Sequence, residues 1–429
     1  MATENNNKIL NVPNKREQSQ TCLGYAEREG QSSQGNVPNK REQSNVPKLR
    51  FPEFSGEWDR ELLGTTCNVL MCKRILTSQT NSEYGVPFYK IGTIGGIPDA
   101  YISQELFELY QAKYNYPRKG EVMITCAGTV GKTIIFDGKD SYYQDSNIVW
   151  IDNPTNKFDN TFLYHFISNV DWSKLNTTTI VRIYNDDLRQ LKISYPTLTE
   201  QRKIANLMTL LDDRIATQIK IIEDLKKLKS AISKQIFAQK PIYWNRLDTL
   251  FSKGKAGGTP TSTNKDYYNG DIPFLSINDI TKQGKYIRYT ENHLSQSGLD
   301  NSSAWIVPAH SLIMSMYASV GLVTINEVPI ATSQAMFAMQ LKNKSLLDYL
   351  YYYLSYFKYR HIHKYLETGT QSNINADIVR SIMIPDYGHG CNIEIASTLQ
   401  SIDAKIDNEL SVLEQLNKQK QYLLSQMFI

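Results

Sequence analysis

Residues 199–239 read TEQRKIANLMTLLDDRIATQIKIIEDLKKLKSAISKQIFAQ and contain neither glycine nor proline. Apolar residues recur there at steps of three and four, the spacing that lines one face of an α-helix. We therefore predict one helix over the whole stretch, capped by Thr199 and, at 1.5 Å per residue, about 60 Å long. Such a helix needs an equally long partner to cover its apolar stripe.

A second helical stripe at the C-terminus repeats the first at a constant offset of 191 residues. Asp212 corresponds to Asp403 and Glu223 to Glu414, so polar as well as apolar positions are repeated. A match of this kind indicates duplication of a larger unit. We expect the two helices to pair through Leu211, Ile215, Ile219, Ile222, Leu225, Ile232, Ile236, Ile402, Ile406, Leu410, Leu413, Leu416, Leu423 and Met427.

The segments that precede the two helices also repeat, at offsets between 186 and 190 residues. Trp244 echoes Trp58, and Leu350-Tyr351 echoes Leu163-Tyr164. In the first copy, β-type runs are expected at 86–91, 122–125, 133–136 and 147–151, and helices near 103–110 and 160–169. The predicted fold class is α+β: two globular mixed α/β domains, each followed by one long helix.

The order of these parts constrains how the helices pair. The second domain joins the end of the first helix to the start of the second, so parallel pairing would stretch that domain back along the whole helix. We therefore predict an antiparallel, coiled-coil-like pair with a pseudo-two-fold axis and one domain near each end. The predicted parts are a tail over 1–48, domains over 49–198 and 241–390, and helices over 199–240 and 391–429.

The first 48 residues are poor in large apolar residues, and NVPNKREQS occurs there twice, at 11–19 and 36–44. This composition predicts disorder, and we assign the tail no chemistry. The whole chain of 429 residues carries a formal charge of only +4, which neither requires nor excludes a nucleic-acid partner. Five irregularly spaced cysteines indicate free thiols, and no signal or membrane-spanning run is expected, so we predict a cytoplasmic protein.

Two patterns suggest enzyme chemistry but are incomplete. Gly128–Thr133 resembles the end of a phosphate-binding P-loop, yet Cys126 stands where the full pattern needs glycine. The second copy has Gly321-Leu322-Val323 at this place, without a lysine, so we favour a strand–turn–strand loop. An NTP-binding enzyme that uses Gly128–Thr133 remains an alternative.

Metal-like pairs occur at His361/His363, His389/Cys391 and Cys67/Cys72, but none has a second pair at a useful spacing. We predict no metal site, no cofactor in this chain and no catalytic residues. A coiled-coil interaction scaffold without DNA binding is a second alternative.

Loops in both copies carry side chains suited to the edges of DNA bases. Asn and Gln can bond adenine in two places, Arg and Lys suit guanine, and Ser and Thr suit either. The candidates in the first copy are Lys90, Thr93, Thr125, Asn147, Arg182, Tyr184 and Asn185. Those in the second copy are Ser276, Asn278, Tyr317, Ser333, Gln334, Thr370, Gln371 and Asn373.

Three motifs resemble the specificity subunit, HsdS, of type I restriction-modification systems. Ile193–Ile204 resembles that family's junction into its first long helix, Gly369–Asn375 a loop near the end of a target-recognition domain, and Gly257–Thr261 a common opening of such a domain. The resemblance extends from about residue 49 to the C-terminus. The second junction, residues 390–394, departs from the pattern because it lacks the Glu-Gln pair found at Glu200-Gln201.

The resemblance implies two target-recognition domains that each read one half of a bipartite site in double-stranded DNA. It also implies docking of two methyltransferase subunits (HsdM), which carry S-adenosylmethionine, and two restriction subunits (HsdR), which use ATP and Mg²⁺. A helix of about 60 Å spans at most about 18 base pairs at about 3.4 Å each. Domains related by a two-fold meet the same side of the duplex one turn apart, so half-site centres about 10 base pairs apart are expected.

Overall fold

The computed structural model describes residues 45–175, 182–317, 319–365 and 373–429. The predicted disorder of the tail therefore concerns residues that lie almost wholly outside the described part. No helix in the described part of the chain is long and apolar enough to cross a membrane.

Two long helices run through the structure, α4 at Leu198–Phe237 and α10 at His389–Met427. Helix α4 begins one residue earlier than the sequence indicated, and Thr197 is its N-cap residue. The amide of Gln201 donates to the carbonyl of Thr197 at 2.9 Å, which closes the first turn. The prediction that Thr199 caps the helix is therefore wrong, because Thr199 already lies inside that turn.

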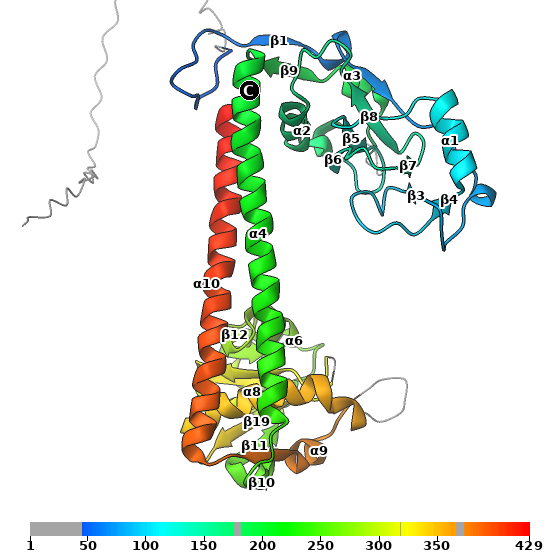
Figure 1. The fold of residues 1–429 in the computed structure, drawn as a ribbon. Helices are drawn as coiled ribbons and strands as arrows, with labels where there is room; N and C mark the ends of the chain where they lie inside the picture. Colours follow the sequence, from blue (N-terminus) through cyan, green and yellow to red (C-terminus); the bar gives the residue numbers. More distant parts are fainter. Residues whose placement is uncertain (1–44, 176–181, 318, 366–372) are drawn as a thin grey trace, which may run out of the picture. The chain divides into compact units, whose positions relative to one another are not determined.

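The two helices pair along their length in opposite directions (Figure 1). Lys229 of α4 bonds Asp403 near the start of α10, and Asp212 of α4 bonds Lys420 near its end. Between these ion pairs, Gln218 Nε2 donates to the backbone oxygen of Glu409 at 3.0 Å. The predicted antiparallel arrangement is thus confirmed.

Gln218 and Glu409 differ by 191 residues and so mark the point where the pseudo-two-fold axis crosses the helix pair. Both are buried within the apolar stripe, which the pattern of apolar residues could not reveal. Among the residues expected to pair, Ile222, Ile406 and Met427 are buried and most others are half-buried. Two helices cover only a narrow seam, and Ile219 and Leu410 keep 43% and 41% of their surface exposed.

The first domain holds nine strands and three α-helices among its described residues. The four-stranded sheet has the order β2-β8-β5-β6, the three-stranded sheet β4-β3-β7, and β1 pairs with β9. The strands are β1 Asp59–Leu62, β2 Asn68–Leu70, β3 Val86–Tyr89, β4 Tyr101–Ile102, β5 Val122–Thr125, β6 Thr133–Ile135, β7 Tyr142–Tyr143, β8 Ile148–Asp152 and β9 Lys192–Tyr195. The helices are α1 Gln104–Lys113, α2 Asn160–Ser168 and α3 Asn185–Arg189.

The second domain is built on a five-stranded sheet, β11-β19-β16-β17-β13, and a four-stranded sheet, β14-β12-β18-β15, while β10 pairs with β20. Its strands are β10 Tyr243–Arg246, β11 Phe251–Ala256, β12 Tyr268–Leu275, β13 Tyr286–Ile287, β14 Asn292–Leu294, β15 Ile306–Val307, β16 Leu312–Ser315, β17 Val323–Asn326, β18 Ile330–Thr332, β19 Met336–Leu341 and β20 Met383–Asp386. Its helices are α5 Leu247–Leu250, α6 Ile277–Gln283, α7 Gln296–Asp300, α8 Leu347–Arg360 and α9 Ala376–Ser381.

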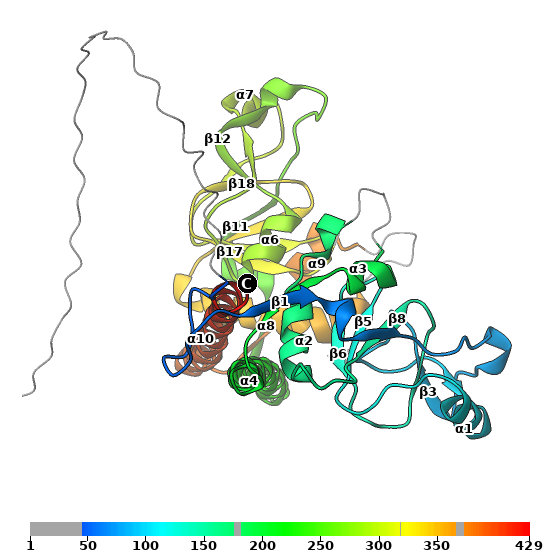
Figure 2. The same ribbon diagram turned by 90° about the horizontal axis from the view of Figure 1, so that it is seen from above.

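The cores of the two domains continue into opposite ends of the helix pair. Ile204 and Met208 of α4 and Leu424 of α10 belong to the core of the first domain. Phe237 of α4 and Leu399 of α10 belong to the core of the second. Figure 2 looks along the two helices, which lie side by side. Each domain therefore packs on one helix end from each copy, as the pseudo-two-fold axis requires.

Candidate nucleic-acid interface

In the first domain, the predicted residues Lys90 and Thr93 lie where β3 ends. Strand β3 runs parallel to β7, so the chain leaves both strands at the same edge. Gln144, which follows β7, donates its amide to the carbonyl of Tyr89 at 2.9 Å. The hydroxyl of Thr93 accepts a hydrogen bond from the amide of Lys90 at 3.0 Å. These bonds fix a turn of polar residues at one edge of the domain.

The turn between β5 and β6 meets this edge, because Lys132 Nζ donates to the carbonyl of Ile94. The amide of Cys126 donates to the carbonyl of Asn147 at 2.7 Å, and the carbonyl of Cys126 accepts from the amide of Ile183 at 2.9 Å. Asn147 and the segment that starts at Arg182 are thereby held beside the same turn.

The aromatic and basic candidates of this edge lie next to each other. The guanidinium carbon of Arg182 is 5.8 Å from the ring centroid of Tyr184, a cation–π contact. Tyr184 keeps 59% of its surface exposed, and Asn185 begins α3 directly after it. Six of the seven predicted residues thus lie along one edge of the domain, and their contact with DNA remains a prediction.

Thr125 is the exception in the first domain. It is fully buried, its hydroxyl donates to the carbonyl of Thr129, and it accepts from the amide of Lys132 at 3.0 Å. A hydroxyl that is consumed in this way cannot reach a base edge. We correct its role from a base contact to a residue that holds the turn.

The second domain forms an edge by the same means. Strand β12 runs parallel to β18, so Ser276 and Asn278 after β12 lie near Ser333 and Gln334 after β18. Ser276 caps α6 by accepting from the amide of Asp279 at 3.2 Å, which occupies its hydroxyl. Gln334 is exposed and its side-chain oxygen accepts from Thr259.

Tyr317 and Asn373 join this edge through Met316. The amide of Met316 donates to the carbonyl of Ala335 at 2.7 Å, and its carbonyl accepts from the amide of Ile374 at 3.1 Å. Tyr317 keeps 40% of its surface exposed, and Asn373 is half-buried. The predicted residues Thr370 and Gln371 lie outside the described residues.

Three further residues lie at these edges and were not among the predicted contacts: Lys132, Gln144 and Thr259. Lys132 was considered only as part of a phosphate loop. Gln144 follows β7, which runs parallel to β3, and residues after two parallel strands lie at one edge. Thr259 follows β11, whose partner β19 is antiparallel, so this rule does not locate it. The pairing of β3 with β7, however, is not readable from the sequence.

Gly128–Thr133 is a turn between two antiparallel strands, since β5 pairs with β6. A P-loop needs a helix after its glycines, so that amides at the helix N-terminus surround the phosphate. Gly128 and Gly131 have φ angles of +68° and +83°, and a Cβ on Gly131 would lie 2.3 Å from Trp172 Cδ1. The glycines therefore serve the turn and its packing, and the alternative of an NTP-binding loop is not supported.

The described cysteines do not form a reactive centre. Burial raises the pKa of the thiols of Cys67, Cys72 and Cys126 to about 12, so they are protonated at neutral pH. Cys391 is exposed. Among the described residues, no group of three His, Cys, Asp or Glu is placed to hold a metal ion.

The tyrosine-rich run at 349–359 forms most of α8 and packs into the second domain. Tyr349, Tyr352 and Tyr353 are buried, and Tyr353 OH donates to the carbonyl of Met383 at 2.9 Å. The run therefore forms a packed aromatic face. Tyr359, at the far end, keeps 78% of its surface exposed.

A histidine is buried where the first domain meets α4. Nδ1 of His165 lies 3.9 Å from Oδ2 of Asp212. Burial lowers the pKa of His165 to about 4, the carboxylates of Asp212 and Asp159 raise it, and Lys420 lowers it further. The unfolded chain, with a histidine pKa near 6.5, therefore binds this proton more readily than the folded chain.

We expect stability to fall as the pH drops from about 6.5 to about 4, by about 3 kcal/mol once the window is crossed. Urea unfolding of the wild type and of His165→Gln at several pH values measures this loss. The variant should lose most of the pH dependence in that window, while His363→Gln, at an exposed histidine, should keep it. Equal pH slopes in all three proteins would refute the assignment.

The comparisons with known proteins follow the same repeat. The family described as "Type I restriction modification DNA specificity domain" matches the chain twice, at residues 56–227 and 241–418. Each range contains one domain and most of the long helix that follows it.

Two curated relatives cover different parts of the chain. A type I restriction enzyme specificity subunit of Haemophilus influenzae is 53% identical over 146 residues, which are 34% of this chain and 38% of that protein. Another, of Methanocaldococcus jannaschii, is 23% identical over 414 residues, which are 89% of this chain and 95% of that protein. The chain thus matches less than half the length of the first relative and nearly all of the second.

Solved structures agree on the fold. The crystal structure of a type I restriction-modification S subunit from M. genitalium has a TM-score of 0.55 at 16% identity, covering 90% of this chain and 99% of that one. A chain from a structural study of assembly and conformational transition in a type I system has a TM-score of 0.56 at 18% identity, covering 86% and 96%. The three chains therefore share one overall fold.

Proposed function

Because the chain belongs to the family of type I restriction-modification DNA specificity domains, we propose that it is the subunit that selects the DNA target of such a system. Each domain would read one half of a bipartite site in double-stranded DNA. The observation that carries this proposal is that two unlike polar edges sit on domains packed at opposite ends of one antiparallel helix pair. The spacer between the half-sites would be left unread.

Methylation and cleavage of the DNA would be carried out by other subunits. The exposed part of the helix pair would carry two methyltransferase subunits, and two restriction subunits would join them. S-adenosylmethionine, ATP and Mg²⁺ would bind in those partners. Exposed apolar residues on the helices, among them Leu210 and Leu228 at 68% and 50% exposure, support a protein partner on this surface.

The test is to express the chain with a type I methyltransferase subunit from the same host, in a strain without other methylation, and to sequence the methylated bases. We expect methylation at one bipartite motif with a fixed spacer. The chain alone should not methylate DNA. Methylation without a bipartite motif, or none at all with an active partner, would contradict the proposal.

Substitutions at the two edges should act on different half-sites. We expect Arg182→Ala to relax the sequence requirement in one half and Gln334→Ala to relax it in the other, each by about tenfold to a hundredfold at one base pair. This is the discrimination that one good side-chain contact with a base provides. Lys139→Ala is the control for lost positive charge. Lys139 is exposed and precedes β7, whereas the polar edge lies where β7 ends.

A change in the same half-site by both variants would contradict the assignment of one half to each domain. A change by Lys139→Ala as large as that of Arg182→Ala would show that the effect is only electrostatic.

A further inference from the structure

A cluster of polar residues lies where each domain meets the helix pair, and the duplication repeats its positions. Lys229 and Asp403 form an ion pair between α4 and α10 at one end, and Lys420 and Asp212 form its counterpart at the other. Lys420 and Asp403 each lie 191 residues after Lys229 and Asp212, respectively. The two ion pairs are therefore equivalent contacts in the two copies of the repeat.

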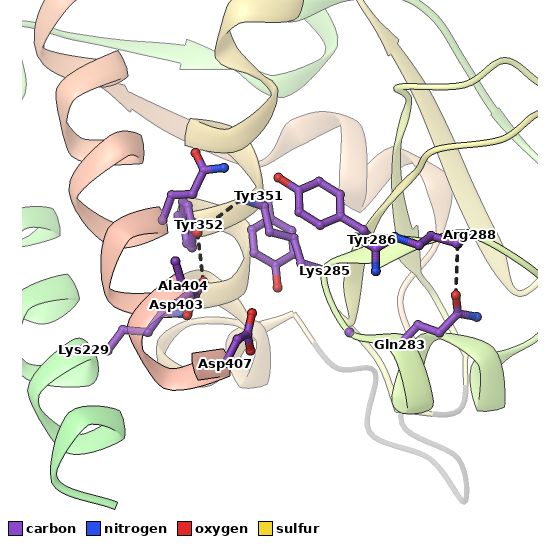
Figure 3. Close-up of a pocket in the computed structure, with 12 residues that line it drawn as sticks. Lys229, Gln283, Lys285, Tyr286, Arg288, Tyr351, Tyr352, Asp403, Ala404 and Asp407 are labelled. Atoms are coloured by element: carbon purple, nitrogen blue, oxygen red, sulfur yellow. Dashed lines mark hydrogen bonds and ion pairs between the residues drawn. The ribbon is translucent and has the colours of Figure 1, made fainter. Parts of the chain in front are cut away.

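A side chain of each domain meets the aspartate of the pair, and the two side chains are also equivalent. Tyr352 of α8 lies 187 residues after His165 of α2, the same offset that relates Leu350 to Leu163. Tyr352 OH donates to Oδ2 of Asp403 at 2.8 Å, as Figure 3 shows. His165 stands at the equivalent position in the first domain. Both side chains are buried, since His165 and Tyr352 keep 2% and 3% of their surface exposed.

The contact is much tighter in the second domain than in the first. Lys285 Nζ donates to Tyr352 OH at 3.2 Å and forms an ion pair with Asp348 at 2.6 Å. The same ammonium lies 4.4 Å and 5.1 Å from the ring centroids of Tyr352 and Tyr351. Lys285, Tyr351 and Tyr352 line a cavity of about 450 Å³ between the second domain and the helices.

The first domain has no comparable chain of bonds at this place within the described residues. The imidazole of His165 lies 3.9 Å from Asp212, beyond hydrogen-bond distance, and 3.5 Å from the hydroxyl of Thr209. Apart from the charge of Asp212, the neighbouring cavity is lined by uncharged groups such as Ile134 and Tyr164.

We propose that the bond from Tyr352 to Asp403 is a positioning contact that fixes the angle of the second domain on the helix pair. This rests on the proposed function for its consequence: Tyr352 helps to set which spacers between the half-sites are accepted. A hydroxyl bonded to a carboxylate is directional and stronger than a bond between neutral groups, which suits it to fix an angle.

The first test does not involve DNA. Spin labels at Lys220→Cys on α4 and Asp300→Cys in the second domain, both exposed sites, report the distance between them in a chain that also carries Cys22→Ser and Cys391→Ser. Tyr352→Phe removes only the hydroxyl and should broaden the distance distribution. Tyr353→Phe is the matched control, because its hydroxyl bonds Met383 within the same domain. Tyr352→His, which copies the first domain, should broaden it as well.

The second test uses the complex with its methyltransferase partner and targets whose spacer is one base pair shorter or longer. Tyr352→Phe should lower the preference for the natural spacer by about threefold to tenfold, the range that one hydrogen bond supplies. Tyr353→Phe should leave it unchanged. Equal distance distributions in all variants, or an unchanged spacer preference despite a broadened distribution, would overturn the inference. A wild-type complex that recognises no bipartite site would instead refute the proposed function, whatever the distances show.

Discussion

Deleting Ile219–Ile222 from α4 together with Leu410–Leu413 from α10 is expected to shorten the accepted spacer by about two base pairs. The two blocks are related by the offset of 191 residues and lie between the parts of the helices that belong to the domain cores. Four residues contribute about 6 Å of helix, and a base pair about 3.4 Å of duplex. The domains should therefore move closer while their own cores stay intact.

At the natural spacer, methylation by the shortened chain should fall by more than tenfold. A single wrong base pair already costs about 1–3 kcal/mol, and the shift displaces a whole half-site. Four residues also turn the helix by about 40° beyond a full turn, so the preferred spacer is best found with a library of spacer lengths. The length-preserving control is Ile219→Ala with Leu410→Ala, at two partly exposed positions. An unchanged preferred spacer in the deletion variant would refute the hypothesis that helix length sets the distance between the half-sites.

Replacing Glu200 by glutamine is expected to destabilise the first domain by about 3 kcal/mol. Nε and Nη2 of Arg50 donate to the two carboxylate oxygens of Glu200, each at 2.7 Å, and Glu200 keeps only 1% of its surface exposed. Hydrogen bonding to Glu200 raises the pKa of Arg50 and burial lowers it. Removing one partner leaves the other charge without compensation, which costs about 3–5 kcal/mol for a fully buried pair. We expect the lower end because Arg50 is slightly exposed.

The neighbouring pair of Lys203 and Glu53 is the matched control. It also joins the segment before β1 to α4, but its side chains are 46% and 45% exposed. Lys203→Met should therefore cost less than about 1 kcal/mol. Urea unfolding, followed through the tryptophans, measures both variants, and similar losses for the two would show that burial does not govern this junction.

The structure also explains why the two junctions differ in sequence. Gln201 bonds the carbonyl of Pro196 at 2.9 Å and the amide of Asp159 at 2.8 Å. Asn392, 191 residues later, is the shorter counterpart, and it bonds the amide of Tyr387 at 3.1 Å. The counterpart of Glu200 is Cys391, whose side chain is exposed. The second junction holds the preceding segment in another way, because Tyr387 OH donates to the carbonyl of Ile236 at 3.3 Å.

The architecture could be predicted from the sequence because it rests on periodicity and repetition. Steps of three and four define a helix face, and an offset of 191 residues defines a duplication, whatever the remaining structure is. Antiparallel pairing then followed from chain order alone. Most of the predicted base-contacting residues also lie at the domain edges, because turns after strands favour polar side chains, and their contact with DNA stays a prediction.

Tertiary structure alone decided which of those side chains remain available and how the domains are fastened. Thr125 reads like any polar loop residue, yet it is buried because its hydroxyl holds a turn. Two further bonds join residues far apart in the chain: Gln218 to Glu409, 191 positions apart, and Tyr352 to Asp403, 51 positions apart. No local sequence pattern predicts either bond. Periodicity depends on neighbours along the chain, whereas a hydrogen bond between distant residues depends on where packing places both partners.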